Sequence, residues 1–350
     1  MAVERDAPVT PDEIRNLIES DFDSLLARAY AVKKSFFGGR VALRGLVEFS
    51  NVCGKNCLYC GIRRDNAGVV RYRMSEDEIV DSAAWAADNG YGSVVLQSGE
   101  IKSDDNTAFV ERVLSRLHKR FGDSFGVTLS LGEQTRETYA RWRDAGAHRY
   151  LLRIETSSPE LYARLHPADH SWTTRRDCLH TLRELGYVVG SGVMIGLPGQ
   201  TTADLANDIR FFRDEDIDMI GMGPFIPTPG TPLGAAEGTP DAPRRLEFAL
   251  RMIAATRICL GNVNIAAATA LQAINPEGRE KGLLAGANVV MPNVTPRKYR
   301  EDYLLYPGKP CTGENSEECR SCLARRIASI GEEIAWGERA DPPHFRERMS

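Results

Sequence analysis

The chain has 350 residues, of which 42% are hydrophobic and 26% are charged, and its formal net charge is −4 at pH 7. This composition is that of an ordinary soluble globular protein with one or two domains. The chain contains no basic tract that would bind nucleic acid through its phosphates, and no apolar run of about 18 residues that would cross a membrane. Because residues 1–8 contain no apolar core, we expect no signal peptide and a cytoplasmic location.

The N-terminal part of the chain predicts helices followed by a strand. Residues 11–36 have apolar residues at helical spacing, and Pro11 after Thr10 is typical of the first turn of a helix. Residues 41–49 form an apolar stretch that predicts the first strand. A capping box at 75–78 then opens the next helix.

From residue 93 onward, a unit of one short apolar strand and one helix recurs. We expect the later strands at residues 93–97, 126–131, 149–153, 188–195, 217–222, 263–267 and 288–291. We expect the helices at residues 75–89, 105–119, 135–144, 159–165, 173–185, 202–213, 244–260 and 276–285, with an irregular link at 223–243.

Eight such strands in a parallel sheet with right-handed crossovers predict an α/β fold, a complete (β/α)8 TIM-type barrel with N-terminal helices and a C-terminal extension. A partial barrel of six units is the alternative. We expect an N-terminal helical segment at 1–38, the barrel at 39–295, and a C-terminal segment at 296–350 that packs on the barrel. In such barrels the chemistry collects at the C-terminal ends of the strands.

The eight cysteines indicate metal or redox chemistry rather than disulfides, because the chain has no export signal. Two of them stand among apolar residues and are expected to be small buried hydrophobic side chains, Cys178 and Cys259. The other six form two compact triplets, Cys53, Cys57, Cys60 and Cys311, Cys319, Cys322.

The first triplet follows the first strand directly, with C-x3-C-x2-C spacing and Tyr59 before the last thiol. Iron–sulfur cubes are normally held by four cysteines, so a loop with three leaves one iron open, and an open position is where a metal site can bind substrate. A zinc knuckle or a redox disulfide is the alternative. Zinc loops usually have a second cysteine or histidine pair, and none follows within roughly the next hundred residues.

Polar residues at the other strand ends predict a ligand site. Gly99 allows a close approach of a ligand to the backbone, although a plain helix-entry loop is the alternative. Thr128 directs a hydroxyl to one face of its strand, with a satisfied core threonine as the alternative. Arg153 and Glu155 share one face at the end of the expected strand at 149–153, where buried charges need partners. A zwitterionic ligand would satisfy both charges, and a structural salt bridge between the two residues is the alternative.

The motif of the first triplet resembles the signature of the radical S-adenosylmethionine (SAM) enzymes. In that superfamily one electron from a reduced [4Fe-4S] cluster cleaves SAM, bound at the open iron, to a 5′-deoxyadenosyl radical. Nearly the whole chain resembles, more closely, the HydE family of [FeFe]-hydrogenase maturases. The resemblance is carried by residues 48–61, 71–74, 95–100, 128–133, 150–153, 221–227, 288–293 and 306–309.

Carried over residue by residue, the resemblance implies a set of site residues. It implies a SAM-binding cluster at Cys53, Cys57 and Cys60, and a dispensable second cluster, [4Fe-4S] or [2Fe-2S], at Cys311, Cys319 and Cys322, where zinc or free thiols are the alternative. It implies SAM contacts at Tyr59, Ser98, Gly99, Glu100, Glu155, Arg175 and Met219. It implies substrate contacts at Thr128, Arg153, Thr269, Met291, Tyr303 and Tyr306.

The resemblance further implies that the radical attacks sulfur in a cysteine-bound iron carbonyl cyanide complex, on the way to the hydrogenase di-iron subcluster. The expected partners are this small-molecule or organometallic substrate, an electron donor such as ferredoxin or flavodoxin, and other hydrogenase maturation proteins. Two positions depart from the family pattern, because Ile154 replaces a histidine and Ala268 replaces a threonine. The alternatives are a radical SAM enzyme on an organic substrate, like methylornithine synthase or biotin synthase, and a non-catalytic iron–sulfur carrier.

Overall fold

The computed structural model describes residues 10–349, so the expected absence of a signal peptide in residues 1–8 lies outside the described residues. Two leading helices, α1 (Pro11–Glu19) and α2 (Phe22–Phe37), precede the sheet. Thr10 caps α1 in a reciprocal capping box with Glu13, which satisfies backbone N–H groups that have no partner within the helix.

Parallel strands alternate with helices along the chain. The strands are β1 (Arg40–Leu43), β2 (Gly45–Ser50), β3 (Ser93–Ser98), β4 (Gly126–Ser130), β5 (Arg149–Leu151), β6 (Val188–Ser191), β7 (Met194–Ile195), β8 (Met219–Pro224), β9 (Asn264–Ala267), β10 (Val289–Val290) and β11 (Glu333–Ile334). The further helices are α3 (Glu76–Asp88), α4 (Asp104–Phe121), the 3-10 turn η1 (Gly122–Ser124), α5 (Arg136–Asp144), α6 (Pro159–Leu165), α7 (Trp172–Glu184), α8 (Thr202–Asp214), α9 (Ala242–Cys259), α10 (Thr269–Ile274), α11 (Gly278–Leu284), α12 (Arg297–Arg300), α13 (Ser316–Ser329) and α14 (Pro343–Met349).

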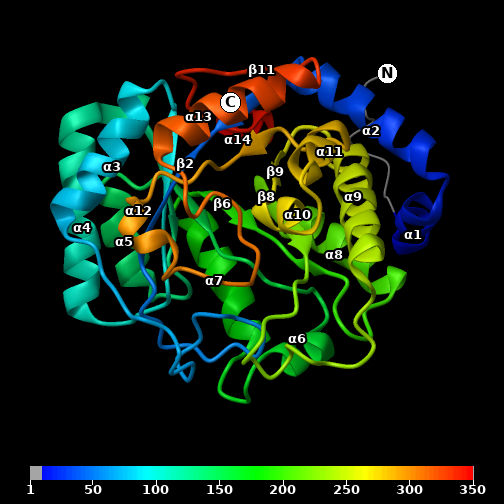
Figure 1. The fold of residues 1–350 in the computed structure, drawn as a ribbon, viewed down its shortest axis with the longest axis horizontal. Helices are drawn as coiled ribbons and strands as arrows, with labels where there is room; N and C mark the ends of the chain where they lie inside the picture. Colours follow the sequence, from blue (N-terminus) through cyan, green and yellow to red (C-terminus); the bar gives the residue numbers. More distant parts are fainter. Residues whose placement is uncertain (1–9, 350) are drawn as a thin grey trace.

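The sheet closes on itself through one interrupted strand. β1 and β2 are separated only by Arg44. β1 pairs with β10 and β2 pairs with β3, so the two halves of this strand join the last and the second strand of the ring. A bridge between Leu46 and Asn293 extends the contact with the last strand. β6 and β7 likewise form one interrupted strand along β8. With each interrupted strand taken as one, the ring has the eight strands of the predicted (β/α)8 barrel, and the prediction is confirmed over the six-unit alternative. Figure 1 shows the helices arranged around these strands.

One helix in the structure was not expected. The helix predicted at 276–285 occurs as α11, and the short helix α10 precedes it, with residues 275–277, which include Pro276, between the two. Proline has no N–H and disfavours helical backbone in the residue before it, which explains the break. Thr269, which follows the end of β9 by two residues, is the first residue of α10.

The C-terminal extension covers the N-terminal ends of the strands, which form the floor of the barrel. β11 pairs with β1, and Asp341 contacts His148 and Arg149 at the start of β5. Figure 1 shows β11 and α14 at the top of the molecule, and α6 with the loop that follows β2 at the opposite end. Buried apolar side chains of the strands and helices form one large core. Within residues 10–349, none of the helices combines the length and the apolar character that a membrane span needs.

Candidate active site

A cavity of about 320 Å³, the mouth cavity, lies at the C-terminal ends of the barrel strands. It collects all three cysteines of the first triplet together with most of the other residues expected in the site. Its lining includes Cys53, Cys57, Tyr59, Cys60, Ser98, Gly99, Glu100, Arg153, Glu155, Arg175, Thr269, Met291, Tyr303 and Tyr306. The fold therefore brings together residues that are far apart in the sequence.

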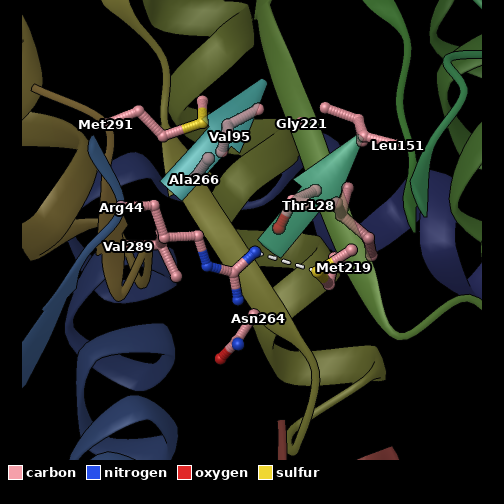
Figure 2. Close-up of a pocket in the computed structure, with 11 residues that line it drawn as sticks. Arg44, Val95, Thr128, Leu151, Met219, Gly221, Asn264, Ala266, Val289 and Met291 are labelled. Carbon is pink, nitrogen blue, oxygen red and sulfur yellow. Dashed lines mark hydrogen bonds between the residues drawn. The ribbon is translucent and has the colours of Figure 1, made fainter. Parts of the chain in front are cut away.

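Thr128 and Met219 instead line a smaller inner cavity of about 30 Å³, deeper in the barrel (Figure 2). There the buried guanidinium of Arg44 points to Met219, with its Nη1 2.9 Å from the sulfur. Burial and the nearby Arg149 hold the pKa of Arg44 well below its ordinary value. The Thr128 hydroxyl is buried and has no hydrogen-bond partner among the described residues. Met291 lines both cavities, which are neighbours.

The loop that carries the first triplet is fixed by its own polar residues. The Arg71 guanidinium donates hydrogen bonds to the carbonyl oxygens of Asn51, Ile62 and Arg63 at 2.6–2.8 Å. The Asn51 side chain donates to Val70 O, 2.7 Å away. These bonds tie both ends of the loop together and hold the cysteines over the strand ends.

The spacing of the three thiols does not suit a single metal ion. Among the described residues, the group of three ligand atoms within 4.8 Å of one another is found elsewhere, at Cys311, Glu314 and Cys319. Zinc–sulfur bonds of about 2.3 Å hold two sulfurs within about 4.6 Å of each other, so the wider first triplet does not fit the zinc alternative. A wider spacing is what a multi-iron cluster needs, because each thiolate there binds its own iron.

Burial also affects how this triplet is charged. It raises the pKa of Cys57 to about 12, and it raises the pKa of Cys53 and of Cys60. Metals bind the thiolate form, so metal binding at this loop releases protons. None of the eight cysteines forms a disulfide in the structure.

A network of buried charges forms one wall of the mouth cavity. Glu133 accepts from Lys55 Nζ and from Arg175 Nε, each at 2.9 Å, and its backbone N–H donates to Glu100 Oε2 at 2.9 Å. Burial acts to raise the pKa of Glu133, but Arg175 and Lys55 outweigh it and lower that pKa to about 2. Burial raises the pKa of Glu100.

Arg175, expected to bind SAM, therefore already has a partner in Glu133. Lys55 and Glu133 were not expected in the site. The available signal was their position, because Lys55 lies between the cysteines and Glu133 follows the end of β4.

Glu155 has a strained backbone at the edge of the cavity. Its φ is 67°, a left-handed conformation that costs about 1–3 kcal/mol in a non-glycine residue. Bonds from Glu155 N–H to Gly192 O and from Met194 N–H to Glu155 O hold it there, both at 3.0 Å. The Glu155 Oε2 and Arg153 Nη2 atoms are 3.0 Å apart, yet neither makes an aligned hydrogen bond and both are buried. The pair is thus a salt bridge with unused hydrogen-bonding capacity next to the cavity.

A loop at 302–310 brings the two expected tyrosines over the mouth cavity. Lys309 Nζ donates to Glu48 Oε2 at 2.6 Å and to Tyr303 O at 2.9 Å, while Gln97 Nε2 donates to the Tyr303 hydroxyl at 3.1 Å. Burial raises the pKa of Tyr303 and of Tyr306, which keeps both as phenols. Glu48 and Lys309 were not assigned from the sequence, although both lie in stretches that resemble the HydE family.

The two positions that depart from the family pattern have different surroundings. Ala268 lines the mouth cavity, so no side-chain hydroxyl faces the cavity at this position, where the resemblance implies a threonine. Ile154 is fully buried in the core and is not among the residues that line the cavity. The second cysteine triplet also lies outside the lining of the mouth cavity.

Comparison with known proteins agrees with this geometry. The family model described as Radical SAM superfamily matches residues 47–212. The [FeFe] hydrogenase maturase subunit HydE of Thermotoga maritima is 47% identical over 320 residues, which cover 91% of this chain and 89% of that protein. The 3-methylornithine synthase of Methanosarcina acetivorans is 27% identical over 288 residues, covering 81% and 79%.

The crystal structure of methylornithine synthase (PylB) superposes with a TM-score of 0.81 at 24% identity and covers 96% of each chain, so it shares the fold. The likeness to the Thermotoga protein is far stronger in sequence and extends over nearly the whole chain. The chain therefore belongs to the HydE family of [FeFe]-hydrogenase maturases, radical SAM enzymes that work with a [4Fe-4S] cluster and S-adenosylmethionine.

Proposed function

We propose that Cys53, Cys57 and Cys60 hold a [4Fe-4S] cluster with one open iron, and that this protein cleaves SAM there during assembly of the hydrogenase di-iron subcluster. When bound, the cluster supplies the electron that breaks the sulfonium bond of SAM. The observation that carries the proposal is the position of the three thiols, which line one cavity together with buried charges that have unused hydrogen-bonding capacity.

The residues around the cavity provide a binding site for the amino acid end of SAM. The Glu155 carboxylate and the Arg153 guanidinium form a salt bridge but make no aligned hydrogen bond through their buried atoms, so the carboxylate can accept from an ammonium group and the guanidinium can donate to a carboxylate. A buried ionic group that lacks hydrogen bonds costs free energy, so a zwitterion that supplies them is stabilised here. Ser98, Gly99, Glu100, Tyr59 and Arg175 line the same cavity and complete the proposed SAM site, whereas the expected Met219 contact lies in the inner cavity.

The proposed substrate is a cysteine-bound iron carbonyl cyanide complex whose sulfur is attacked by the radical. The mouth cavity of about 320 Å³ is within the size range of small-molecule sites. Met291, Thr269, Tyr303 and Tyr306 form the part of its lining that we assign to this substrate. A ferredoxin or flavodoxin as electron donor, and other hydrogenase maturation proteins, are the proposed partners.

A radical SAM reaction on an organic substrate is the second candidate. It is favoured by Ala268, where the cavity wall has no side-chain hydroxyl although the resemblance implies a threonine. It is also consistent with the shared fold of methylornithine synthase.

The first experiment tests SAM cleavage. Protein reconstituted with iron and sulfide under anaerobic conditions should release 5′-deoxyadenosine when given dithionite and SAM. Cys57→Ala should abolish the release, whereas Cys178→Ala, a change at a buried core cysteine, should retain it. Full release by Cys57→Ala would show that the first triplet is not the catalytic ligand set.

The second experiment tests the substrate. Addition of a synthetic cysteine-bound iron carbonyl cyanide complex should speed the release of 5′-deoxyadenosine and consume the complex. Unchanged release, with the complex recovered intact, would favour the organic substrate.

A further inference from the structure

The loop that carries the first triplet packs against the end of α6 and the residues that follow it. Leu58 N–H donates to Leu165 O at 2.9 Å. The rings of Tyr59 and His166 meet edge to face, with 5.6 Å between their centres. Both contacts lie within two residues of Cys57, so the segment after α6 fixes the middle of the loop.

His170 adds a third contact, to the peptide group just before Cys57. The Asn56 N–H donates to His170 Nε2 at 3.3 Å, and His170 Nδ1 lies 2.7 Å from Asp169 Oδ1. Because a backbone N–H can only donate, Nε2 must carry a lone pair, and the ring proton is on Nδ1, where it donates to Asp169. Burial lowers the pKa of His170, which favours this neutral imidazole in one fixed tautomer.

The neighbours of His170 hold its ring in place. The side chain is 2% exposed, and its ring stacks on that of His166 with 5.7 Å between the centres. The His166 ring stacks in turn on Tyr162, with 3.9 Å between the centres. The side chain of Asn56 is held as well, since it donates to Asp65 Oδ2 at 2.6 Å. Donor and acceptor are therefore both rigid, as a supporting contact of a ligand site must be.

The Asn56 N–H is important because it lies next to a metal ligand. Hydrogen bonds to the sulfurs of an iron–sulfur cluster are among the factors that set its reduction potential. Such a bond is available to the first triplet, since Glu100 N–H lies 3.4 Å from Cys53 Sγ. The Asn56 N–H is instead bound to His170. An N–H donor stabilises the more negative, reduced form of a cluster, so a donor that is bound elsewhere leaves the potential lower.

We propose that His170 is a positioning residue for the cluster of the first triplet, because it holds the peptide before Cys57 and keeps the Asn56 N–H from sulfur. This inference rests on the proposed function, which assigns the cluster to that triplet. We expect His170 to slow the loss of iron and to lower the potential at which one electron from the electron donor reduces the cluster. His170 does not line the mouth cavity, so it acts through the peptide that it holds.

The test uses the full chain with Cys311→Ala and Cys322→Ala, so that iron bound at the first triplet is measured alone. His170→Phe keeps an aromatic ring to stack on His166 and removes the acceptor. His170→Gln removes the ring but offers a side-chain oxygen as acceptor. His118→Phe is the control, because His118 is an exposed residue of α4. Circular dichroism checks that each variant is folded.

Hydrogen exchange before iron is added measures the bond itself. The peptide that contains Asn56 should exchange faster in His170→Phe than in the wild type, and at nearly the wild-type rate in His170→Gln. After reconstitution, a chelator should remove iron at least about tenfold faster from His170→Phe, since residues that support metal ligands change metal affinity by about 10–100-fold. His170→Gln and His118→Phe should retain iron as the wild type does.

A redox titration followed by electron paramagnetic resonance measures the potential. The midpoint potential should be higher in His170→Phe by about 59 mV, which corresponds to a tenfold change in a one-electron equilibrium. His170→Gln should restore the wild-type value, because its oxygen again takes the Asn56 N–H. A change that affected only folding would not move the potential in this way.

Wild-type exchange and iron loss in His170→Phe would overturn the proposal. Equal losses in His170→Gln and His170→Phe would also overturn it, because the acceptor would then have no effect. If His170→Phe does not fold, Asp169→Asn takes its place, since the Asp169 side chain is 68% exposed.

An amide N–H2 at position 169 can donate to His170 Nδ1 and so place the ring proton on Nε2, which then cannot accept from Asn56. Asp169→Asn should therefore speed exchange and iron loss, and wild-type values would overturn the proposal. A wild-type protein that holds iron but releases no 5′-deoxyadenosine would contradict the proposed function alone.

Discussion

Asp208 of α8 supports the part of the chain that carries the strained Glu155. Its side chain is fully buried, and its Oδ1 accepts a hydrogen bond of 2.6 Å from Ser157 N–H, two residues after Glu155. Because burial removes the carboxylate from water, the pKa of Asp208 is raised from 3.8 to about 7. Asp208 therefore positions a segment of the site while it titrates near neutral pH.

We expect Asp208→Asn to change how stability depends on pH. The pKa of Asp208 is higher in the folded than in the unfolded protein. Its contribution to the free energy of unfolding is therefore fully present below about pH 4 and is lost as the pH rises through about 7. Each pKa unit corresponds to about 1.4 kcal/mol. Asparagine keeps an acceptor oxygen for Ser157 and has no charge, so the variant should exceed the wild type in free energy of unfolding at pH 8 by about 1–4 kcal/mol, with a smaller gain at pH 5.

Urea unfolding at several pH values measures this difference. Asp214→Asn, a change at an exposed residue of the same helix that pairs with Arg210, is the control and should follow the wild type. Parallel profiles of the wild type and Asp208→Asn would contradict the prediction.

The residues of the site differ in how well the sequence predicts them. The first triplet, Gly99 and Glu100 follow from motif spacing and from positions at strand ends. The pairing of Lys55 with Glu133 joins residues 78 apart, and that of Glu48 with Lys309 joins residues 261 apart. No local pattern encodes such pairs. These pairs form because the barrel places the ends of its strands side by side, and only the three-dimensional structure shows them.

At the scale of single elements, the end of β3 is shaped to receive the loop with the first triplet. A Cβ atom on Gly99 would lie 2.3 Å from Val52 O and 2.7 Å from Cys53 Cβ, distances at which atoms overlap. Gly54 N–H also donates to Glu100 O at 2.7 Å. The loop and the strand end are therefore in direct backbone contact, and glycine is needed there.

Gly99→Ala should displace this loop and reduce the iron bound at the first triplet. We expect iron content per chain and 5′-deoxyadenosine release to fall together, since both depend on the position of Cys53. Gly68→Ala is the control, because its Cβ would meet only Asn66 Oδ1 at 3.4 Å, an ordinary contact. Normal iron content in Gly99→Ala would show that the loop can shift without loss of its ligands.

The barrel strands could be predicted from the sequence, whereas β11 and α10 could not. All eight barrel strands were expected from apolar runs between turns, and each occurs within a few residues of its expected place. β11 has only two residues and lies outside the repeated units of strand and helix, and it pairs with β1. The helix expected at 276–285 occurs as α11, whereas the short helix α10 before it was not expected.

At the scale of the whole molecule, the C-terminal extension closes the floor of the barrel through buried charges. Asp341 Oδ1 accepts from Arg149 Nε and lies near His148 Nε2, each at 2.9 Å. Burial acts to raise the pKa of Asp341, but His148 and Arg149 outweigh it and hold that pKa well below its ordinary range. Arg149 has no exposed surface, so Asp341 neutralises a charge that water does not reach. The boundaries expected near residues 38 and 295 stay predictions.

Asp341→Asn should destabilise the fold strongly. Removal of one partner from a buried ion pair costs about 3–5 kcal/mol, because the other charge is left buried and unpaired. Glu338→Gln is the control, since Glu338 pairs with Arg40 at an exposed position, where such pairs contribute about 0–1 kcal/mol. Thermal and urea unfolding of both variants at pH 7 measure the difference, and similar losses in the two would argue against the role of Asp341.

The interrupted strand of β1 and β2 also affects how the protein is made. Its Glu48 N–H bonds to Thr295 Oγ1, 247 residues later in the chain. During translation this strand leaves the ribosome long before its second neighbour exists, and an unpaired strand edge readily joins another chain. Pairings between residues so distant in sequence form slowly. We therefore expect a long period after synthesis in which the protein can aggregate or bind chaperones. During this period its cysteines are exposed, because the cavity that will surround them has not yet formed.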